Sequence, residues 1–322
     1  MNGDWNEDLS GHVDTPARIP ASGVMPDTGL SDAVAPEPEA TPFEPSAMRH
    51  PLPPMRFPNM ADVGLLVVML LFAALGVAGI TAAALHFHLF GVTTPKQGIT
   101  DVRYQFGEQI LWYFLAFIGS MMLFPVLWHT EFFRGLEWRF SAALRARSRL
   151  VGTTIFCLVL AVIDGRLMPG PDNAPIDEVF RRPGTAWFLL FFGTLLAPFF
   201  EELFFRGFLL PAFCTAYDWT TERMQHRPAP WPDEEGKTIW STPAMAVGSV
   251  LVSIPFALIH SPQTGYSVGP FLLLFCVSLV LCWVRLRVRS LAASTFVHAG
   301  YNLVLFATMI VATGGFRHMD KM

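Results

Sequence analysis

The chain has 322 residues, of which 52% are hydrophobic and 15% are charged, and its mean hydropathy is +0.42. This composition excludes an ordinary soluble globular protein and predicts a chain that crosses a membrane several times. The formal net charge is −4 at pH 7, and no block of lysine and arginine residues indicates a nucleic-acid partner.

The first 59 residues differ in composition from the rest of the chain. They are rich in Pro, Ala, Ser, Asp and Glu and show almost no apolar periodicity. Such a segment cannot bury a core, so residues 1–59 are predicted to form a disordered tail. No basic region followed by an apolar stretch is found there, and we expect no signal peptide. Residues 60–322 are predicted to form one transmembrane helical bundle.

Seven apolar segments follow the tail, and most are long enough to cross about 30 Å of hydrocarbon. The third is short, and we expect it to extend back into the arginine-rich residues that precede it. Residues 93–108, 164–183 and 217–243 are expected to be polar loops. The fold class is therefore all-α, a polytopic bundle of about seven to eight helices. The expected spans are approximately residues 63–85, 109–128, 150–163, 187–213, 244–259, 269–284 and 291–313.

Two groups of arginines lie between the spans, in residues 131–149 and 285–289. Aromatic and arginine side chains alternate in the first group, as is typical of a helix lying in the membrane interface. Arginine-rich loops mark the cytoplasmic side. If successive spans alternate in direction, both groups lie on that side and the N-terminus is cytoplasmic. The Ala-, Arg- and Pro-rich composition favours a bacterial inner membrane.

The most unusual segment is residues 199–208, where Glu201, Glu202 and Arg206 interrupt an apolar and aromatic stretch. Each charge in a bilayer costs about 2.5–3.5 kcal/mol on insertion scales, so charges within a span indicate a functional site. Glu202 and Arg206 are four residues apart, which places them on one helix face where they can pair. Glu201 lies about 100° around the helix and is left for another role.

Further polar residues occur in two later spans. His260 ends the segment 256–260, while His298 and Asn302 are four apart and share a helix face. Singly, each could be an interfacial residue or could join neighbouring helices by a hydrogen bond. Together with the glutamates and the arginine they all need polar partners, and one shared polar cavity would supply them. His260 and His298 lie at different depths of their segments, so the sequence leaves open how they meet.

This set of side chains suits hydrolysis of a peptide bond. A carboxylate and a histidine close together can activate water as general base and acid. A second histidine and an amide can stabilise a tetrahedral oxyanion. The motifs, in this order, resemble those of the CPBP family, the CAAX-processing and bacteriocin-processing intramembrane endopeptidases, also called the Abi family. They are Glu201-Glu202-x-x-x-Arg206, Phe256-x-x-x-His260 and His298-x-x-x-Asn302.

The resemblance covers roughly residues 188–312, and we expect a protease-like core at about 186–313. It implies a glutamate-dependent endopeptidase that acts on a peptide or membrane-protein substrate in the lipid bilayer. Glu201 and His260 would activate the water, and His298 and Asn302 would form the oxyanion site. The supporting residues would be Glu202, Arg206 and Phe256.

Two alternatives remain open. Glu201, His260 and His298 could bind a catalytic zinc with one open position. Since the chain has no H-E-x-x-H motif and the family is glutamate-dependent, we expect no metal or other cofactor. A transporter or scaffold could use the same side chains as a proton relay or ligand site. Pseudo-symmetric halves are common in transporters, and none is apparent in this sequence.

Overall fold

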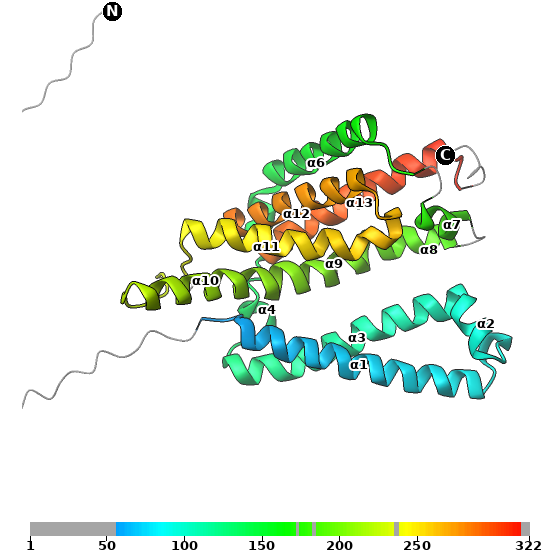
Figure 1. Ribbon diagram of the computed structural model, residues 1–322, viewed down its shortest axis with the longest axis horizontal. Coiled ribbons are helices and arrows are strands. Elements are labelled where there is room, and N and C mark those ends of the chain that lie inside the picture. Colours follow the sequence, from blue (N-terminus) through cyan, green and yellow to red (C-terminus); the bar gives the residue numbers. More distant parts are fainter. Residues whose placement is uncertain (1–55, 172–173, 182–184, 235–237, 317–322) are drawn as a thin grey trace, which may run out of the picture. The chain divides into compact units, whose positions relative to one another are not determined.

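The computed structural model describes residues 56–171, 174–181, 185–234 and 238–316 (Figure 1). The described residues form helices and connecting turns and contain no strand. Within the described ranges, seven helices are long and apolar enough to cross a membrane, which confirms the predicted all-α polytopic bundle. Nearly all of the predicted disordered tail, residues 1–59, lies outside the described residues.

Five of the seven spans agree closely with the predicted segments, and the second begins seven residues before its predicted start. The exception in length is the fourth, a continuous helical segment of 40 residues, Thr185–Met224, built from several consecutive helical stretches. The other spans are α1 (Met60–His86), α3 (Val102–Trp128), α6 (Arg147–Leu167), α11 (Thr242–His260) with the 3-10 turn η4 (Ser261–Thr264), α12 (Val268–Val288) and α13 (Leu291–Ala312).

Three predicted loops contain helical residues. Local caps explain one of them: Thr94 and Gln97 form a capping box at the start of α2 (Pro95–Thr100), with Pro95 in the first turn. The Asp101 side chain then accepts a hydrogen bond of 2.8 Å from the Arg103 amide, so α3 begins at Val102 rather than near residue 109. The Arg103 side chain also bonds Asp101 and lowers the pKa of this carboxyl to about 2.

The remaining short helices lie between spans. Helix α7 occupies part of the predicted loop 164–183, and α10 continues eight residues into the predicted loop 217–243. The interfacial segment of arginines and aromatic residues forms two short helices rather than one. These short elements are η1 (Leu89–Gly91), α4 (Phe132–Gly135), α5 (Phe140–Arg145) and α7 (Pro175–Arg181).

The helices pack around two apolar clusters. Helix α1 lies beside α3, while α11 packs against both α10 and α12, and α6 packs against α12 and α13 (Figure 1). One apolar cluster centres on Phe124, Phe208 and Leu210, and a second on Leu281 and Val297. The fourth span therefore contacts α11 on one side and α13 on another, which is the arrangement that assembles the polar site.

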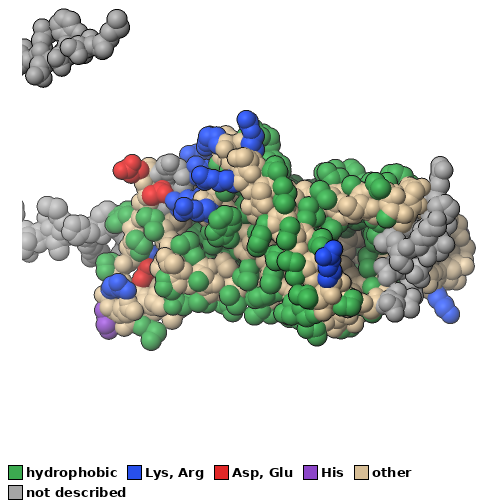
Figure 2. Space-filling model, turned by 90° about the horizontal axis from the view of Figure 1, so that it is seen from above, with side chains coloured by type: hydrophobic (Ala, Val, Ile, Leu, Met, Phe, Trp, Pro, Cys, Tyr) green, Lys and Arg blue, Asp and Glu red, His purple; other side chains and the backbone are tan. Residues whose placement is uncertain are grey.

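The outer surface suits a lipid environment. Leu71 and Phe72 on α1 are more than half exposed, and so are many other apolar side chains along the spans. Figure 2 shows apolar side chains over most of the visible face and a group of basic side chains toward its left end. Exposed apolar surface of this extent requires lipid or a partner to cover it. The chain is a multi-pass membrane protein.

Candidate active site

The two adjacent glutamates lie in a helix that changes its winding on both sides of them. Helix α9 (Ala197–Glu202) carries Glu201 and Glu202 and follows α8 (Thr185–Phe191) through the π-helical turn η2 (Phe192–Leu196). A second π-helical segment, η3 (Leu203–Leu209), leads into α10 (Leu210–Met224). Such turns are rare and are frequently found at functional sites. Glu202, Arg206 and most residues of η3 are buried.

The first π-helical turn also connects the fourth span to α13. The Asn302 side chain donates a hydrogen bond of 2.8 Å from Nδ2 to the carbonyl oxygen of Gly193. A Cβ atom at Gly193 would lie 2.9 Å from the ring of Phe306, so the absence of a side chain permits this close approach. The sequence did not indicate a role for Gly193, because glycine occurs at many positions of apolar spans for reasons unrelated to a functional site.

The depth of His260 is explained by the offset between α11 and α13. The amide of Ser241, which precedes α11, bonds Asp218 at 2.9 Å, so α11 begins beside Asp218. Helix α13 begins beside Gly207, where a Cβ atom would lie 3.2 Å from the Leu291 side chain. These two levels of the fourth span are separated by about 16 Å along its axis at 1.5 Å per residue. Helix α11 therefore starts about 16 Å before α13 along the same axis, at 1.5 Å per residue. This offset brings His260, the last residue of α11, to the level of His298, which lies near the start of α13.

Both histidines lie close to Glu201. The Oε2 atom of Glu201 is 3.8 Å from Nε2 of His260 and 3.8 Å from Nε2 of His298. This separation is longer than a direct hydrogen bond and short enough for one water molecule to bridge the atoms. The Glu201 side chain is 16% exposed and that of His298 is 7% exposed, so the group is largely shielded but still accessible. The two histidines and Glu201 come from three different spans.

The other nitrogen of each imidazole has a specific partner. Nδ1 of His260 is 2.7 Å from the carbonyl oxygen of Phe256. Because a carbonyl only accepts hydrogen bonds, Nδ1 carries the hydrogen, and Nε2 of the neutral ring is the acceptor that faces Glu201. Nδ1 of His298 is 3.1 Å from Oε1 of Glu202. If Glu202 is ionised, it is likewise an acceptor and orients His298.

Glu202 and Arg206 form the predicted ion pair. Arg206 Nη1 is 2.9 Å from Glu202 Oε1, and neither side chain has any exposed surface. Nη2 of the same arginine donates to the Ser278 hydroxyl at 2.8 Å and to its carbonyl oxygen at 3.2 Å. The guanidinium carbon also lies 4.4 Å from the centroid of the Phe256 ring, which is a cation–π contact. Phe256 therefore contacts both Arg206 and His260.

The motif residues line a cavity of about 640 Å³. A second cavity, of about 750 Å³, lies elsewhere in the bundle. The cavity of about 640 Å³ is lined by Glu201, His260, His298 and Asn302. Tyr113 of α3 also lines it and, like Glu201, lines an adjoining apolar cavity of about 240 Å³. Volumes in this range accommodate ligands of drug or short-peptide size. Tyr113 lies outside the motifs, and no pattern in the sequence indicated that α3 would contribute to the site.

The three candidate metal ligands lie further apart than the ligands of a bound zinc ion. In a tetrahedral site with bonds of 2.0–2.2 Å, two donor atoms are about 3.4 Å apart. The two 3.8 Å separations between Glu201 and the imidazoles are wider than this. Among the described residues, no group of three His, Cys, Asp or Glu side chains has the arrangement of a metal site.

Residues 183–304 match the family model described as type II CAAX prenyl endopeptidase Rce1-like. The match covers 122 of the 322 residues, and over this segment the chain is similar to the CAAX proteases. The matched segment contains every motif residue of the site, from Glu201 to Asn302, and confirms the family resemblance seen in the sequence. No curated protein and no solved structure gave a significant match to the chain. The matched segment includes α8 and ends at residue 304 within α13, whereas α1, α3 and α6 precede it.

Proposed function

We propose that the protein is an intramembrane endopeptidase that hydrolyses a peptide bond of a membrane-associated peptide or protein. Residues 186–313 form its catalytic core. The observation that carries the proposal is the position of Glu201 Oε2, 3.8 Å from Nε2 of both His260 and His298 at the wall of a 640 Å³ cavity. The family match to proteases supports the same class of reaction.

Glu201 and His260 activate the water in this proposal. One hydrogen of the water faces the Glu201 carboxylate, and the other donates to the unprotonated Nε2 of His260. As the water oxygen forms a bond with the carbonyl carbon of the substrate, Glu201 accepts the first proton. When the C–N bond breaks, Glu201 returns this proton to the amine that leaves. The carbonyl of Phe256 keeps His260 in the tautomer that the step needs.

His298 and Asn302 stabilise the oxyanion of the tetrahedral intermediate. The Asn302 amide has two N–H groups, and only one is used by the hydrogen bond to Gly193. His298 donates through Nε2 when its ring is doubly protonated, with Nδ1–H directed to Glu202. Glu202 and Arg206 do not contact the substrate in this mechanism. They hold His298 in place, and Ser278 in turn holds Arg206.

We propose further that the arginine-rich end of the bundle faces the cytoplasm of a bacterial cell. Arg134, Arg145 and Arg287 are exposed at this end, where α3 and α12 finish and α6 begins. An excess of arginine in short connections marks the cytoplasmic side of a membrane protein. Arg56 and the start of α1 then also lie on that side, because Arg56 bonds Glu222 and Asp62 bonds Trp128, and this supports the proposed cytoplasmic N-terminus.

The proposal is tested by mapping protein termini in membranes from cells that express the wild-type chain or the Glu201→Gln variant. We expect new C-terminal and membrane-proximal cleavage products that are found only with the wild-type chain. A transporter or scaffold with the same polar cluster would give identical termini in both samples. Identical termini, together with loss of uptake of a solute in histidine variants, would contradict the peptidase proposal.

Metal dependence is tested separately on the purified protein. In the proposed mechanism the base is Glu201 and no metal takes part. EDTA or phenanthroline is therefore expected to leave more than about 80% of the cleavage rate. The measurement is the initial rate of peptide cleavage before and after chelation, with zinc added back in a third sample. Loss of activity that zinc restores would favour the metal-dependent alternative with Glu201, His260 and His298 as ligands.

A further inference from the structure

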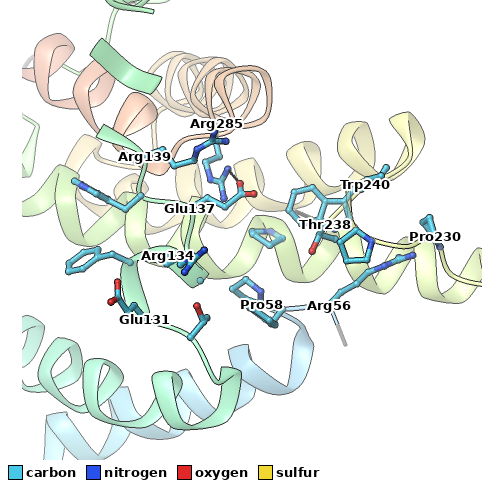
Figure 3. Close-up of a pocket in the computed structure, with 18 residues that line it drawn as sticks. Arg56, Pro58, Glu131, Arg134, Glu137, Arg139, Pro230, Thr238, Trp240 and Arg285 are labelled. Carbon is cyan, nitrogen blue, oxygen red and sulfur yellow. Dashed lines mark hydrogen bonds and ion pairs between the residues drawn. The ribbon is translucent and has the colours of Figure 1, made fainter. Parts of the chain in front are cut away.

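A cavity larger than the one around Glu201 lies away from the active site. It has a volume of about 750 Å³ and shares no lining residue with the cavity around Glu201. Its walls come from the residues before α1, the connection from α3 to α5, the start of α10, the residues before α11 and the end of α12. Figure 3 shows side chains that line this cavity, among them the paired Arg285 and Glu137, Arg56 and Pro58, and Thr238 and Trp240.

The lining has an excess of positive charge. Four arginines and two glutamates contribute to it, so positive groups exceed negative groups by two. Arg285 pairs with Glu137 at 2.7 Å and also donates to the Leu136 carbonyl oxygen. The remaining charged residues of the lining are Arg56, Glu131, Arg134 and Arg139.

Two buried arginine N–H groups in this lining lack an acceptor. The Arg285 side chain is only 3% exposed, and no group in the described part of the chain accepts a hydrogen bond from its Nε. Nη1 of Arg56 is also buried without an acceptor there, although Nη2 bonds Glu222 at 2.7 Å. Buried guanidinium N–H groups normally have acceptors. An anion in the cavity would supply them, and the fork of donors in arginine fits the oxygens of a phosphate.

The surroundings favour a phosphate that belongs to a lipid. The cavity lies where α1 begins and α3 and α12 end, which is the edge of the membrane-spanning region. Trp138 and Trp240 line it, and tryptophan is enriched at the level of lipid headgroups. Next to the lining residue Arg139, the apolar side chains of Phe140 and Leu144 on α5 are about half exposed. These side chains could contact acyl chains, which a free phosphate does not have.

We propose that this cavity binds the phosphate headgroup of an anionic phospholipid, with the acyl chains lying along the adjacent helices. Basic pockets between transmembrane helices bind such headgroups by the same chemistry. The site is separate from Glu201 and the histidines, so the proposal does not depend on the reaction proposed above.

The test uses the full chain purified in an uncharged detergent. Its melting temperature is measured against increasing dioleoyl phosphatidylglycerol, dioleoyl phosphatidylcholine or inorganic phosphate. We expect phosphatidylglycerol to raise the melting temperature in a saturable way, because a ligand that binds the folded state stabilises it. Phosphatidylcholine and inorganic phosphate at the same concentrations are expected to have little effect.

Arg134→Gln tests the site itself. Arg134 is exposed, so its replacement leaves the buried Arg285–Glu137 and Arg56–Glu222 pairs intact. The half-saturating concentration of phosphatidylglycerol is expected to rise about fivefold, which corresponds to the loss of one arginine near an anionic headgroup. The matched control is Arg147→Gln, which removes an exposed arginine at the same end that does not line the cavity. It is expected to change this concentration less than about twofold.

Three results would overturn the proposal. Equal stabilisation by phosphatidylcholine would remove the requirement for an anionic headgroup. Equal stabilisation by inorganic phosphate would identify a site for a free phosphate rather than a lipid. An equal effect of Arg134→Gln and Arg147→Gln would show a diffuse response to surface charge in place of a defined site.

Discussion

The Glu201→Gln variant is expected to fold normally and to lose about 10²–10⁴-fold in kcat, with KM nearly unchanged. Glutamine has the shape of glutamate but cannot accept a proton from water. Glu201 lies at the wall of the cavity and is partly exposed, so the substitution leaves no buried charge unpaired. The measurement is steady-state cleavage of a substrate identified by mapping of termini, together with the melting temperature of the variant.

The matched control is Glu108→Gln on α3. The Glu108 carboxylate accepts a hydrogen bond from Thr81 at 2.9 Å and does not line the cavity around Glu201. A glutamine at this position can still accept that bond, so kcat is expected to change less than about twofold, in line with a small surface effect. Loss of a general base typically lowers the rate by about 10²–10⁴-fold. If Glu201→Gln retained more than about a tenth of the wild-type kcat, Glu201 would therefore not be the base.

The Arg206→Met variant is expected to lose about 3–5 kcal/mol of stability, since it leaves a buried carboxylate without its partner. Arg206 and Glu202 are both fully buried, and the Ser278 hydroxyl also loses its partner in this variant. Unfolding is measured in mixed micelles with increasing SDS content. The control is Arg145→Met, which replaces an exposed arginine and is expected to change stability by no more than about 0.5 kcal/mol.

The double variant Glu202→Gln/Arg206→Met separates charge burial from packing. Because it removes both charges, it is expected to recover most of the stability lost in Arg206→Met. The free energies of unfolding of the single and double variants are compared in the same micelles. A double variant no more stable than Arg206→Met would show that the loss comes from packing around Phe256 rather than from the unpaired Glu202.

Features that depend on one helix at a time could be predicted well from the sequence. The seven spans follow from hydropathy, because every buried backbone group in a bilayer must be paired within a helix. The pairing of Glu202 with Arg206 follows from a spacing of four residues. The common face of His298 and Asn302 follows in the same way, and both line one cavity. Short helices within the polar loops were missed, since a few capping residues give a weaker signal than a long apolar segment.

Contacts between helices could not be predicted in the same way. Ser278 and Gly193 contact motif residues, and Tyr113 lines the same cavity, yet each is an ordinary residue of an apolar span. The buried N–H groups of Arg56 and Arg285 came from segments more than 200 residues apart in the chain. Their positions depend on how the helices are shifted along one another, and nothing in the local spacing specifies this shift.

The sequence by itself determined the number of spans, the side chains that carry charge within them and the family that the segment around them resembles. Only the tertiary structure decided that His260 and His298 reach the same carboxylate. The apolar segments place these histidines at different depths, and the offset of α11 relative to α13 compensates for the difference. Hydropathy measures how favourably each helix enters the lipid, and a shift of one helix along another leaves that quantity almost unchanged. The shift is determined instead by specific contacts such as Asp218 with Ser241 and the close approach of Gly207 to Leu291.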